Sequence, residues 1–217
     1  MSGGSDSVGK VNLSPFVPAI KEIKSTTDLK INAHVGLTPT EELRRLVSSG
    51  IDSFSVDLYG DDLTIHEVLG LDAKADDYFR VFEDLCRFGA RTVAPHICVG
   101  IHGGELKGEL RAIERLKKLE PRVLILISLI PTKGSAYEKV LAPSGNLIRS
   151  VIERAREELP NTKLVLGCMR SKLDRTSECD LVRAGLDGIV LPAAKTVDKL
   201  RADGYTIKRR ATCCSLI

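Results

Sequence analysis

The stretch Val123-Leu124-Ile125-Leu126-Ile127-Ser128-Leu129 is a run of apolar, β-prone residues that ends shortly before Pro131. It lies between two amphipathic stretches, Leu106–Leu119 and Asn146–Glu158, whose apolar residues recur with the period of a helix. A buried strand with a helix on either side is typical of parallel sheets whose strands are joined by crossover helices. We therefore interpret this stretch as the strand of one strand-helix unit.

The same alternation runs along the whole chain and predicts six strand-helix units. The expected strands are Leu29–Ala33, Phe54–Leu58, Thr92–Cys98, Val123–Leu129, Lys163–Gly167 and Gly188–Leu191. The expected helices are Phe16–Lys24, Thr40–Ser49, Ala75–Phe88, Leu106–Leu119, Asn146–Glu158, Ser177–Arg183 and Lys195–Ala202. This pattern predicts one α/β domain over residues 1–207 and a tail over 208–217. It fits either a doubly wound sheet or most of a (β/α)8 barrel, and both place active groups at the carboxyl ends of the strands.

Composition excludes several classes of protein. The 217 residues are 43% hydrophobic and 28% charged, and 32 basic against 29 acidic residues give a net charge of +3. Such mixed charge, with only 5 Phe, 4 Tyr and no Trp, argues against a nucleic-acid partner. The apolar runs are far shorter than the roughly 20 residues of a membrane helix, and the start has no apolar signal region. We expect a cytoplasmic protein with no membrane partner.

The cysteines predict neither a disulfide framework nor a familiar metal motif. There are six, Cys86, Cys98, Cys168, Cys179, Cys213 and Cys214, and no CxxC or CxxxCxxC spacing occurs in the chain. A disulfide framework is not expected in a cytoplasmic chain of this size. Metal ligation by the paired thiols of the tail and a disordered chain end both remain open.

Polar residues gather where the expected strands end. His96 and Cys98 come at the end of one strand, ahead of Gly104 and Glu105, and glycines next to a helix start let an anionic ligand approach the backbone. Glu105 could instead only complement the dipole of the helix that follows. The stretch from 96 to 105 is therefore a candidate binding site.

Three further strand ends carry candidates, each with a plainer alternative. Asn32 and His34 share one strand face, although a lone histidine is often structural. Asp57, with Tyr59 beside it, could bind sugar hydroxyls or simply form an Asx turn. Cys168 and Arg170 also follow a strand. Arg170 is the better candidate of the two, because an arginine at a strand end tends to bind an anion, whereas a buried cysteine is usually only a small apolar residue.

The order of these motifs resembles the radical S-adenosylmethionine (SAM) superfamily, and within it the biotin synthase and lipoyl synthase-like branch. The resemblance covers essentially the whole chain. It rests on the order of four elements, Gly3-Gly4-Ser5, Gly50-Ile51-Asp52 leading to Asp57, Gly100-Ile101-His102-Gly103-Gly104-Glu105 and Ile130-Pro131-Thr132-Lys133-Gly134-Ser135. It implies a TIM-type barrel, SAM and a 4Fe-4S cluster as cofactors, and a small-molecule substrate or lipoyl-type carrier as partner.

The resemblance also assigns roles to residues. Gly3 and Gly4 match the loop that holds the SAM amino group, although Ser5 replaces its acid. Asp57 and Tyr59 fall where the family contacts ribose or substrate. Gly104 and Glu105 match the end of an element that supports SAM. The loop with Pro131 matches the strand end near the adenine.

A second group of residues corresponds to the auxiliary cluster site of biotin synthase. Arg170 falls where that enzyme has an arginine ligand, while Asn32 and His96 stand where it has cysteines, which puts biotin synthesis in doubt. Lipoyl synthase-like or other sulfur insertion fits better. An auxiliary Fe-S cluster would then draw on thiols among Cys98, Cys168, Cys213 and Cys214.

The main departure from the family is the lack of the CxxxCxxC motif that binds its catalytic cluster. The sequence thus holds no ligands for the 4Fe-4S cluster, and we expect an incomplete barrel that lacks the first strand-helix-strand, with Met1 at the end of the family's second strand. The leading hypothesis is a radical SAM enzyme core that cleaves SAM and abstracts a substrate hydrogen only in a full-length form, or with a partner subunit that supplies the missing segment.

Two alternatives stay open beside this hypothesis. One is a non-catalytic, cluster-free subunit that binds a SAM-like ligand. The other is an unrelated barrel enzyme that acts on a small anionic substrate through Arg170 and His96.

Overall fold

The computed structural model describes residues 1–171 and 178–216. Its strands form one all-parallel sheet in which the spatial order follows the chain order, β1-β2-β3-β4-β5-β6. The strands are β1 (Asn32–His34), β2 (Ser53–Asp57), β3 (Val93–Val99), β4 (Val123–Ser128), β5 (Lys163–Leu166) and β6 (Gly188–Ile189). A doubly wound sheet reverses its strand order, whereas this one does not. The prediction of an incomplete TIM-type barrel with six parallel strands is therefore confirmed.

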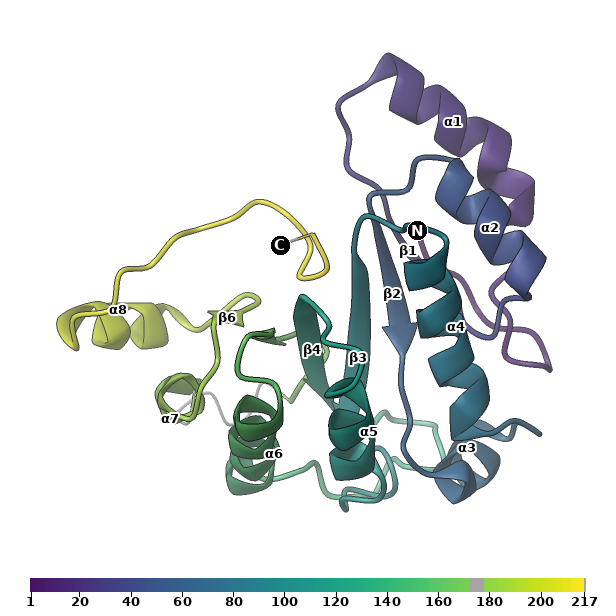
Figure 1. The fold of residues 1–217 in the computed structure, drawn as a ribbon. Coiled ribbons are helices and arrows are strands. Elements are labelled where there is room, and N and C mark those ends of the chain that lie inside the picture. Colours follow the sequence, from purple (N-terminus) through teal and green to yellow (C-terminus); the bar gives the residue numbers. More distant parts are fainter. Residues whose placement is uncertain (172–177, 217) are drawn as a thin grey trace.

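Helices connect the strands on the outer side of the curved sheet (Figure 1). They are α1 (Val17–Thr26), α2 (Thr40–Ser48), α3 (Asp62–Leu69), α4 (Ala75–Arg87), α5 (Glu109–Leu116), α6 (Gly145–Glu158), α7 (Glu178–Arg183) and α8 (Ala194–Ala202), with a short 3-10 turn η1 (Ser14–Phe16) ahead of α1. After α8 the chain crosses back to the concave side of the sheet, where it ends near the amino ends of the strands (Figure 1).

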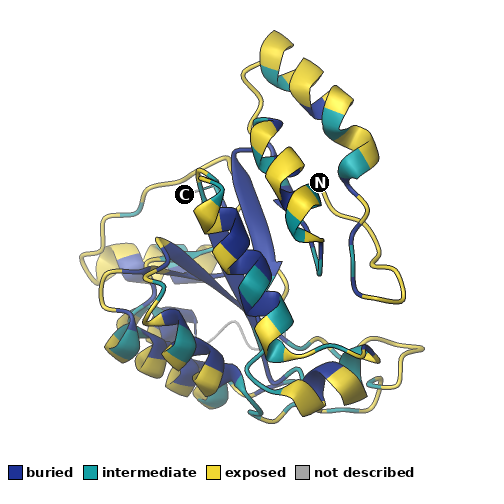
Figure 2. Cartoon of the chain, turned by 45° about the vertical axis from the view of Figure 1, so that its right-hand side comes forward, coloured by how far each residue is buried: buried dark blue, intermediate teal, exposed yellow. Residues whose placement is uncertain are grey.

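The core has two parts because each strand has two faces. The larger cluster fills the space between the sheet and the outer helices and includes Phe54, Val56, Leu124 and Leu126. A smaller cluster on the concave face consists of Ala94, Val123, Ile125 and Val165. Figure 2 shows the consequence: the central strands β2, β3 and β4 are buried along most of their length, and the helices are buried on one side.

Several predicted boundaries were wrong. The first strand does not start at Leu29, which is exposed, and β1 begins at Asn32. Helix α3 was not predicted, because its eight residues follow a strand end that looked like a plain loop. Helix α5 starts at Glu109 rather than Leu106, because Gly108 before it has a φ of 111°. The predicted helix start at Ser177 lies outside the described residues.

The outer edge of β1 pairs with the start of the chain. The amine of Met1 donates a hydrogen bond to the carbonyl of Asn32, and the amide of His34 donates to the carbonyl of Met1 at 3.0 Å. One residue bonded to the two residues that flank its partner is the pattern of a parallel ladder. Met1 therefore lies beside β1 as a strand neighbour would.

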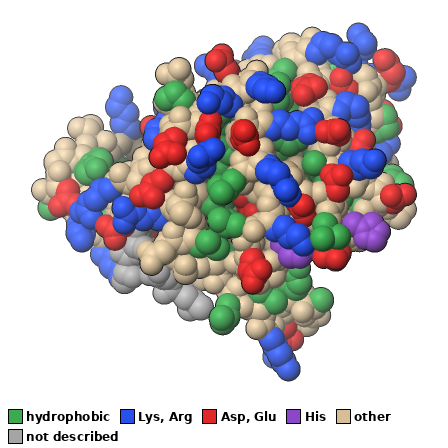
Figure 3. Space-filling view, turned by 60° about the horizontal axis from the view of Figure 1, so that its bottom comes forward, with side chains coloured by type: hydrophobic (Ala, Val, Ile, Leu, Met, Phe, Trp, Pro, Cys, Tyr) green, Lys and Arg blue, Asp and Glu red, His purple; other side chains and the backbone are tan. Residues whose placement is uncertain are grey.

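Charged side chains of both signs cover one end of the molecule (Figure 3). Lys, Arg, Asp and Glu side chains are interspersed over the end of the molecule where the strands have their carboxyl ends (Figure 3). Among residues 1–171 and 178–216, no helix combines the length and the apolar character that crossing a bilayer requires.

Candidate functional site

A cavity of about 370 Å³ opens at the carboxyl ends of β1 and β2, under the loop that begins the chain. Side chains or backbone of five predicted site residues line it, namely Gly3, Ser5, His34, Asp57 and Tyr59. The remaining lining residues are Ser2, Gly9, Val11, Gly36, Leu69, Leu71 and Tyr78. Of the described residues that line the cavity, none is a lysine or arginine, so Asp57 provides the only formally charged side chain among them.

The N-terminal loop is fixed over this cavity by a close approach of two glycines. The amide of Leu37 donates to the carbonyl of Gly9 at 2.8 Å, and Lys10 bridges to Gly36. Gly36 has a φ of 56°, and a Cβ added to it would lie 2.4 Å from the carbonyl oxygen of Gly9. Only glycine at position 36 allows this contact. The contact keeps the N-terminal loop, which carries Gly3 and Ser5, in place over the cavity.

Asp57 has an unusual environment for a carboxylate. It ends β2 on the concave face and pairs in register with His96 of β3, while His34 of β1 is in register with Ser55, the preceding residue on the same face. Among the described residues, its carboxylate has no hydrogen-bond partner, while burial raises its pKa and the neighbouring His34 lowers it. A desolvated carboxylate that faces a cavity without a protein partner is suited to bind a cationic or hydroxyl-bearing ligand.

The two histidines near Asp57 are in an environment that favours the neutral form of their rings. Their ring centroids lie 5.1 Å apart. His96 is buried, its Nδ1 donates to the carbonyl of Ala94 at 2.9 Å, and burial lowers its pKa to about 4. Burial also lowers the pKa of His34, against an opposing effect of Asp57. At neutral pH the pair therefore adds no positive charge, and Nε2 is the nitrogen of His96 that can accept a hydrogen bond.

Two tyrosines close the cavity on the side of the outer helices. Tyr59 follows β2, Tyr78 lies in the first turns of α4, and their rings pack edge to face with centroids 4.8 Å apart. Burial, with Asp57 nearby, raises the pKa of Tyr78 to about 12 and that of Tyr59 well above its usual value. Both phenols thus stay protonated and can donate hydrogen bonds to a ligand.

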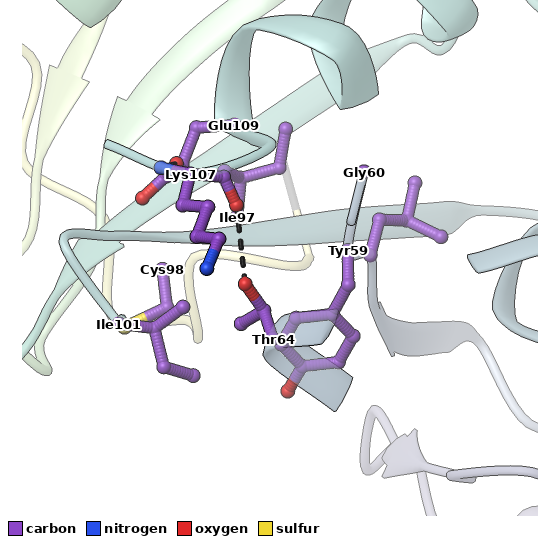
Figure 4. Close-up of a pocket in the computed structure, with 9 residues that line it drawn as sticks. Tyr59, Gly60, Thr64, Ile97, Cys98, Ile101, Lys107 and Glu109 are labelled. Atoms are coloured by element: carbon purple, nitrogen blue, oxygen red, sulfur yellow. Dashed lines mark hydrogen bonds between the residues drawn. The ribbon is translucent and has the colours of Figure 1, made fainter. Parts of the chain in front are cut away.

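A second, much smaller cavity of about 10 Å³ lies between the carboxyl ends of β2 and β3 (Figure 4). That volume holds about one water molecule. Tyr59, Thr64, Cys98 and Lys107 are among the residues around it. Burial, together with Asp57 and Glu109, raises the pKa of Cys98 to about 12, so this thiol stays protonated.

The loop from 100 to 108 is organised by one buried carboxylate. Glu109, the first residue of α5, accepts hydrogen bonds from the amides of Gly100 at 2.7 Å and Lys107 at 2.6 Å. Gly104 packs against the backbone of Leu141, and the side chain of Glu105 is exposed. These two residues were predicted to support SAM, as were Gly4 and Pro131. None of the four is among the residues that line the large cavity.

Arg170 is engaged inside the protein. Its guanidinium forms a buried ion pair with Glu178 at 3.0 Å and donates to the carbonyls of Gly167 at 2.7 Å and Leu191 at 3.4 Å. These bonds join the loop after β5 to the loop after β6. An arginine with this set of partners acts as a tie between strand ends, and a ligand anion would have to compete with Glu178.

Among the described residues, the remaining candidates for an auxiliary cluster do not form a group of three ligands, although the sulfurs of Cys213 and Cys214 lie 3.8 Å apart. Asn32 lies at the amino end of β1, where its amide contacts the Cys213 thiol at 4.0 Å, while Cys168 is exposed after β5. Across 1–171 and 178–216, no three His, Cys, Asp or Glu residues are placed to hold a metal ion. In the described part of the chain, no cluster-binding group therefore forms from Cys98, Cys168, Cys213 and Cys214.

Sequence reasoning missed Tyr78 as a residue of the site. Tyr78 belongs to a predicted helix, and its place on the apolar face of that helix indicates burial in the core rather than contact with a ligand. The signal that could have found it is the geometry of the barrel, because α4 starts at the level of the strand carboxyl ends. Leu69 and Leu71 were missed because α3 was missed.

The fold and the cavity together define an open α/β barrel with a ligand cavity at the carboxyl ends of its strands. Comparison with protein-family models found no match, and comparison with curated proteins found none either. Solved structures do share the fold. The FeFe-hydrogenase maturase HydG from Carboxydothermus hydrogenoformans is 19% identical with a TM-score of 0.67, over 89% of this chain and 51% of HydG.

Two further structures extend the comparison. Methylornithine synthase (PylB) is 15% identical with a TM-score of 0.66, over 91% of this chain and 64% of PylB. Coproporphyrinogen III oxidase (HemN) from Escherichia coli, a radical SAM enzyme, is 14% identical with a TM-score of 0.52, over 69% of this chain and 37% of HemN. The protein therefore has the barrel fold found in radical SAM enzymes, and it spans about half the length of HydG.

Proposed function

We propose that this chain is the SAM-binding core of a radical SAM-type enzyme. The observation that carries the proposal is the cavity at the carboxyl ends of β1 and β2. Among the described residues, the Asp57 carboxylate has no hydrogen-bond partner and is the only formally charged side chain that lines this cavity. A sulfonium and an ammonium group give SAM net positive charge where it would meet that carboxylate. Its ribose hydroxyls can bond to Asp57, Tyr59 or Tyr78.

Each side of the cavity has a role in this proposal. The loop with Gly3 and Ser5 presents backbone groups to the amino acid end of the ligand, because Gly36 lets it approach β1 closely. Neutral His34 and His96 avoid repulsion of a cation. Leu69 and Leu71 exclude water from one side. When bound, SAM supplies the adenosyl group on which the chemistry of such enzymes depends.

The described residues do not fit a 4Fe-4S cluster, since no three suitable side chains come together and the sequence contains no CxxxCxxC motif. No step through a cluster is assigned to the residues of this chain. The proposal is that the cluster ligands come from a segment outside this sequence or from a partner subunit. The finer assignment to the biotin synthase and lipoyl synthase-like branch, with a small molecule or lipoyl-type carrier as substrate, rests on motif order alone.

A second candidate function is a cluster-free subunit that binds SAM or a similar ligand without cleaving it. The missing thiolate motif is the observation that favours it. Both candidates predict SAM binding. They differ in whether SAM is cleaved once cluster ligands are supplied.

One experiment separates them. The purified chain is reconstituted with iron and sulfide under anaerobic conditions, and 5′-deoxyadenosine is measured with SAM and a reductant present. We expect SAM to bind and no 5′-deoxyadenosine to form from the chain alone, and product formation would contradict the assignment of the cluster ligands. Gain of product when a CxxxCxxC-bearing segment is added supports the enzyme core, whereas binding without product supports the subunit.

A further inference from the structure

The last residues of the chain are folded into the concave face of the barrel instead of projecting from it (Figure 1). Ser215 is fully buried, with no exposed side-chain surface. Its carbonyl accepts a hydrogen bond from the Ser53 hydroxyl at 2.5 Å, and its own hydroxyl lies 2.9 Å from that of Ser55. A plain disordered end would make none of these contacts.

The barrel provides a matching surface for this segment, which we call the tail seat. It consists of Asn32 of β1, Ser53 and Ser55 of β2, and the small apolar cluster of the concave face, Ala94, Val123, Ile125 and Val165. The side chain of Cys214 packs against that cluster. Barrel interiors are usually filled by bulky branched side chains, but β2 presents two serines here. The tail fills the space that those serines leave.

Few contacts hold the segment before it reaches the seat. Residues 203–212 between α8 and the seat form no helix or strand, and Lys208, Arg209 and Arg210 are exposed. Within the described residues 205–216, the hydrogen bonds to the strands are those of Ser215 and the long thiol contact of Cys213. Release of the tail therefore requires little of the fold to open.

The tail seat and the ligand cavity share the short edge strand β1. This strand has three residues: Asn32 at one end belongs to the seat and accepts a hydrogen bond from the Ser55 hydroxyl at 3.1 Å, while His34 at the other end lines the cavity. Loss of the tail would leave Ser53, Ser55 and Asn32 facing an opened interior. Order in β1 then depends on its remaining neighbours.

We propose that residues 213–216 are a releasable plug that docks in cis on the tail seat, closes the amino end of the open barrel and orders β1 beneath the ligand cavity. The proposal does not depend on which ligand the cavity takes. Its occupant is the C-terminus of this chain, and docking of the tail of a second copy is the competing arrangement.

The test uses the full chain and its own thiols as reporters. Alkylation rates of Cys213 and Cys214 are measured by mass spectrometry, together with hydrogen exchange in β1 and β2. In the unaltered chain, Cys213 is exposed and Cys214 is packed on the seat, so we expect Cys213 to react at least about tenfold faster. Equal rates would overturn the proposal, and a difference that disappears on dilution would show docking from a second copy and overturn docking in cis.

A matched pair of variants tests the seat itself. Ser215→Glu places a carboxylate in a site with no exposed surface, whereas Thr212→Glu makes the same change at an exposed position of the same tail. We expect only Ser215→Glu to speed alkylation of Cys214 and hydrogen exchange in β1 and β2, by about tenfold. Equal behaviour of the two variants contradicts the plug.

A peptide experiment covers the case in which Ser215→Glu fails to fold. A synthetic peptide spanning residues 211–216 is added in excess to the unaltered chain, and Cys214 alkylation in the protein is followed. Competition for the seat predicts faster alkylation with this peptide and no change with the same peptide carrying Ser215→Glu. No effect of either peptide at millimolar concentration would count against a releasable tail.

Discussion

At the scale of single residues, Asp57 and its neutral surroundings decide what the cavity can bind. Burial raises the pKa of this carboxyl, and among the described residues no hydrogen bond compensates for its desolvation. Such a group destabilises the folded state when it is ionised, because the unfolded chain solvates it better. In the proposed function, a bound cation would offset this cost by contact with the carboxylate.

Replacement of Asp57 by Asn is therefore expected to leave the protein as stable as before or more stable. The change removes a buried charge while it keeps size and polarity. We expect the midpoint of thermal unfolding, followed by circular dichroism, to stay or rise. Asp76→Asn is the matched control, because Asp76 is exposed and forms a surface ion pair with Arg115. A clearly lower midpoint for Asp57→Asn alone would mean that Asp57 has a structural role.

His96 gives a prediction for pH dependence. Burial lowers its pKa from 6.5 to about 4, so the unfolded chain binds a proton in this range while the folded chain does not. Stability is therefore fully present above pH 6.5 and lost as pH falls toward 4, by an amount on the order of 3 kcal/mol. Asp57 opposes the loss, because its raised pKa lets the folded state take up a proton first.

The measurement is urea unfolding of the unaltered chain and of His96→Gln at pH 7, 6 and 5. Glutamine does not titrate, so we expect the variant to lose less stability over this range than the unaltered chain. Parallel loss in both proteins would show that His96 does not carry the pH dependence.

At the scale of elements, the N-terminal loop is held by the contact between Gly36 and Gly9. Gly36→Ala would place a Cβ 2.4 Å from a backbone oxygen at a φ of 56°. Gly70→Ala has the same left-handed requirement, with a φ of 66°, and no atom within 4 Å of the added Cβ. The pair separates backbone strain from steric collision.

We expect Gly70→Ala to cost about 1 kcal/mol and Gly36→Ala clearly more, because only the second displaces the loop over the cavity. Urea unfolding measures the change in the free energy of unfolding, and the affinity for SAM shows whether the cavity is altered. If both variants lost the same free energy of unfolding and SAM affinity did not change, the loop would not depend on the glycine contact.

The elements also show what sequence can predict. The bounds of β4, α4 and α6 lie within two residues of the predicted bounds, because long periodic stretches carry a strong signal. Helix α3 did not, since its eight residues follow directly on a strand end. Part of the cavity was predicted as strand-end residues, but Tyr78 and the buried Ser215 depend on how distant segments pack, which no local pattern encodes.

At the scale of the whole molecule, an open parallel barrel leaves strand edges that need cover. Met1 pairs along the outer edge of β1, and the tail fills part of the concave face. Both chain ends thus contact the short strand β1, which also carries His34 of the cavity. This arrangement places the cover of the open barrel at the same strand that lines the cavity.

The central claim is that the cavity selects a cationic nucleoside ligand through Asp57, and calorimetric titration tests it most directly. The unaltered chain and Asp57→Asn are each titrated with SAM and with S-adenosylhomocysteine, which lacks the sulfonium charge. We expect the unaltered chain to bind one SAM and to prefer it over S-adenosylhomocysteine by on the order of 10-fold to 100-fold, and the variant to lose that preference. Equal affinity of the unaltered chain for both ligands, or a preference that persists in the variant, would contradict the claim.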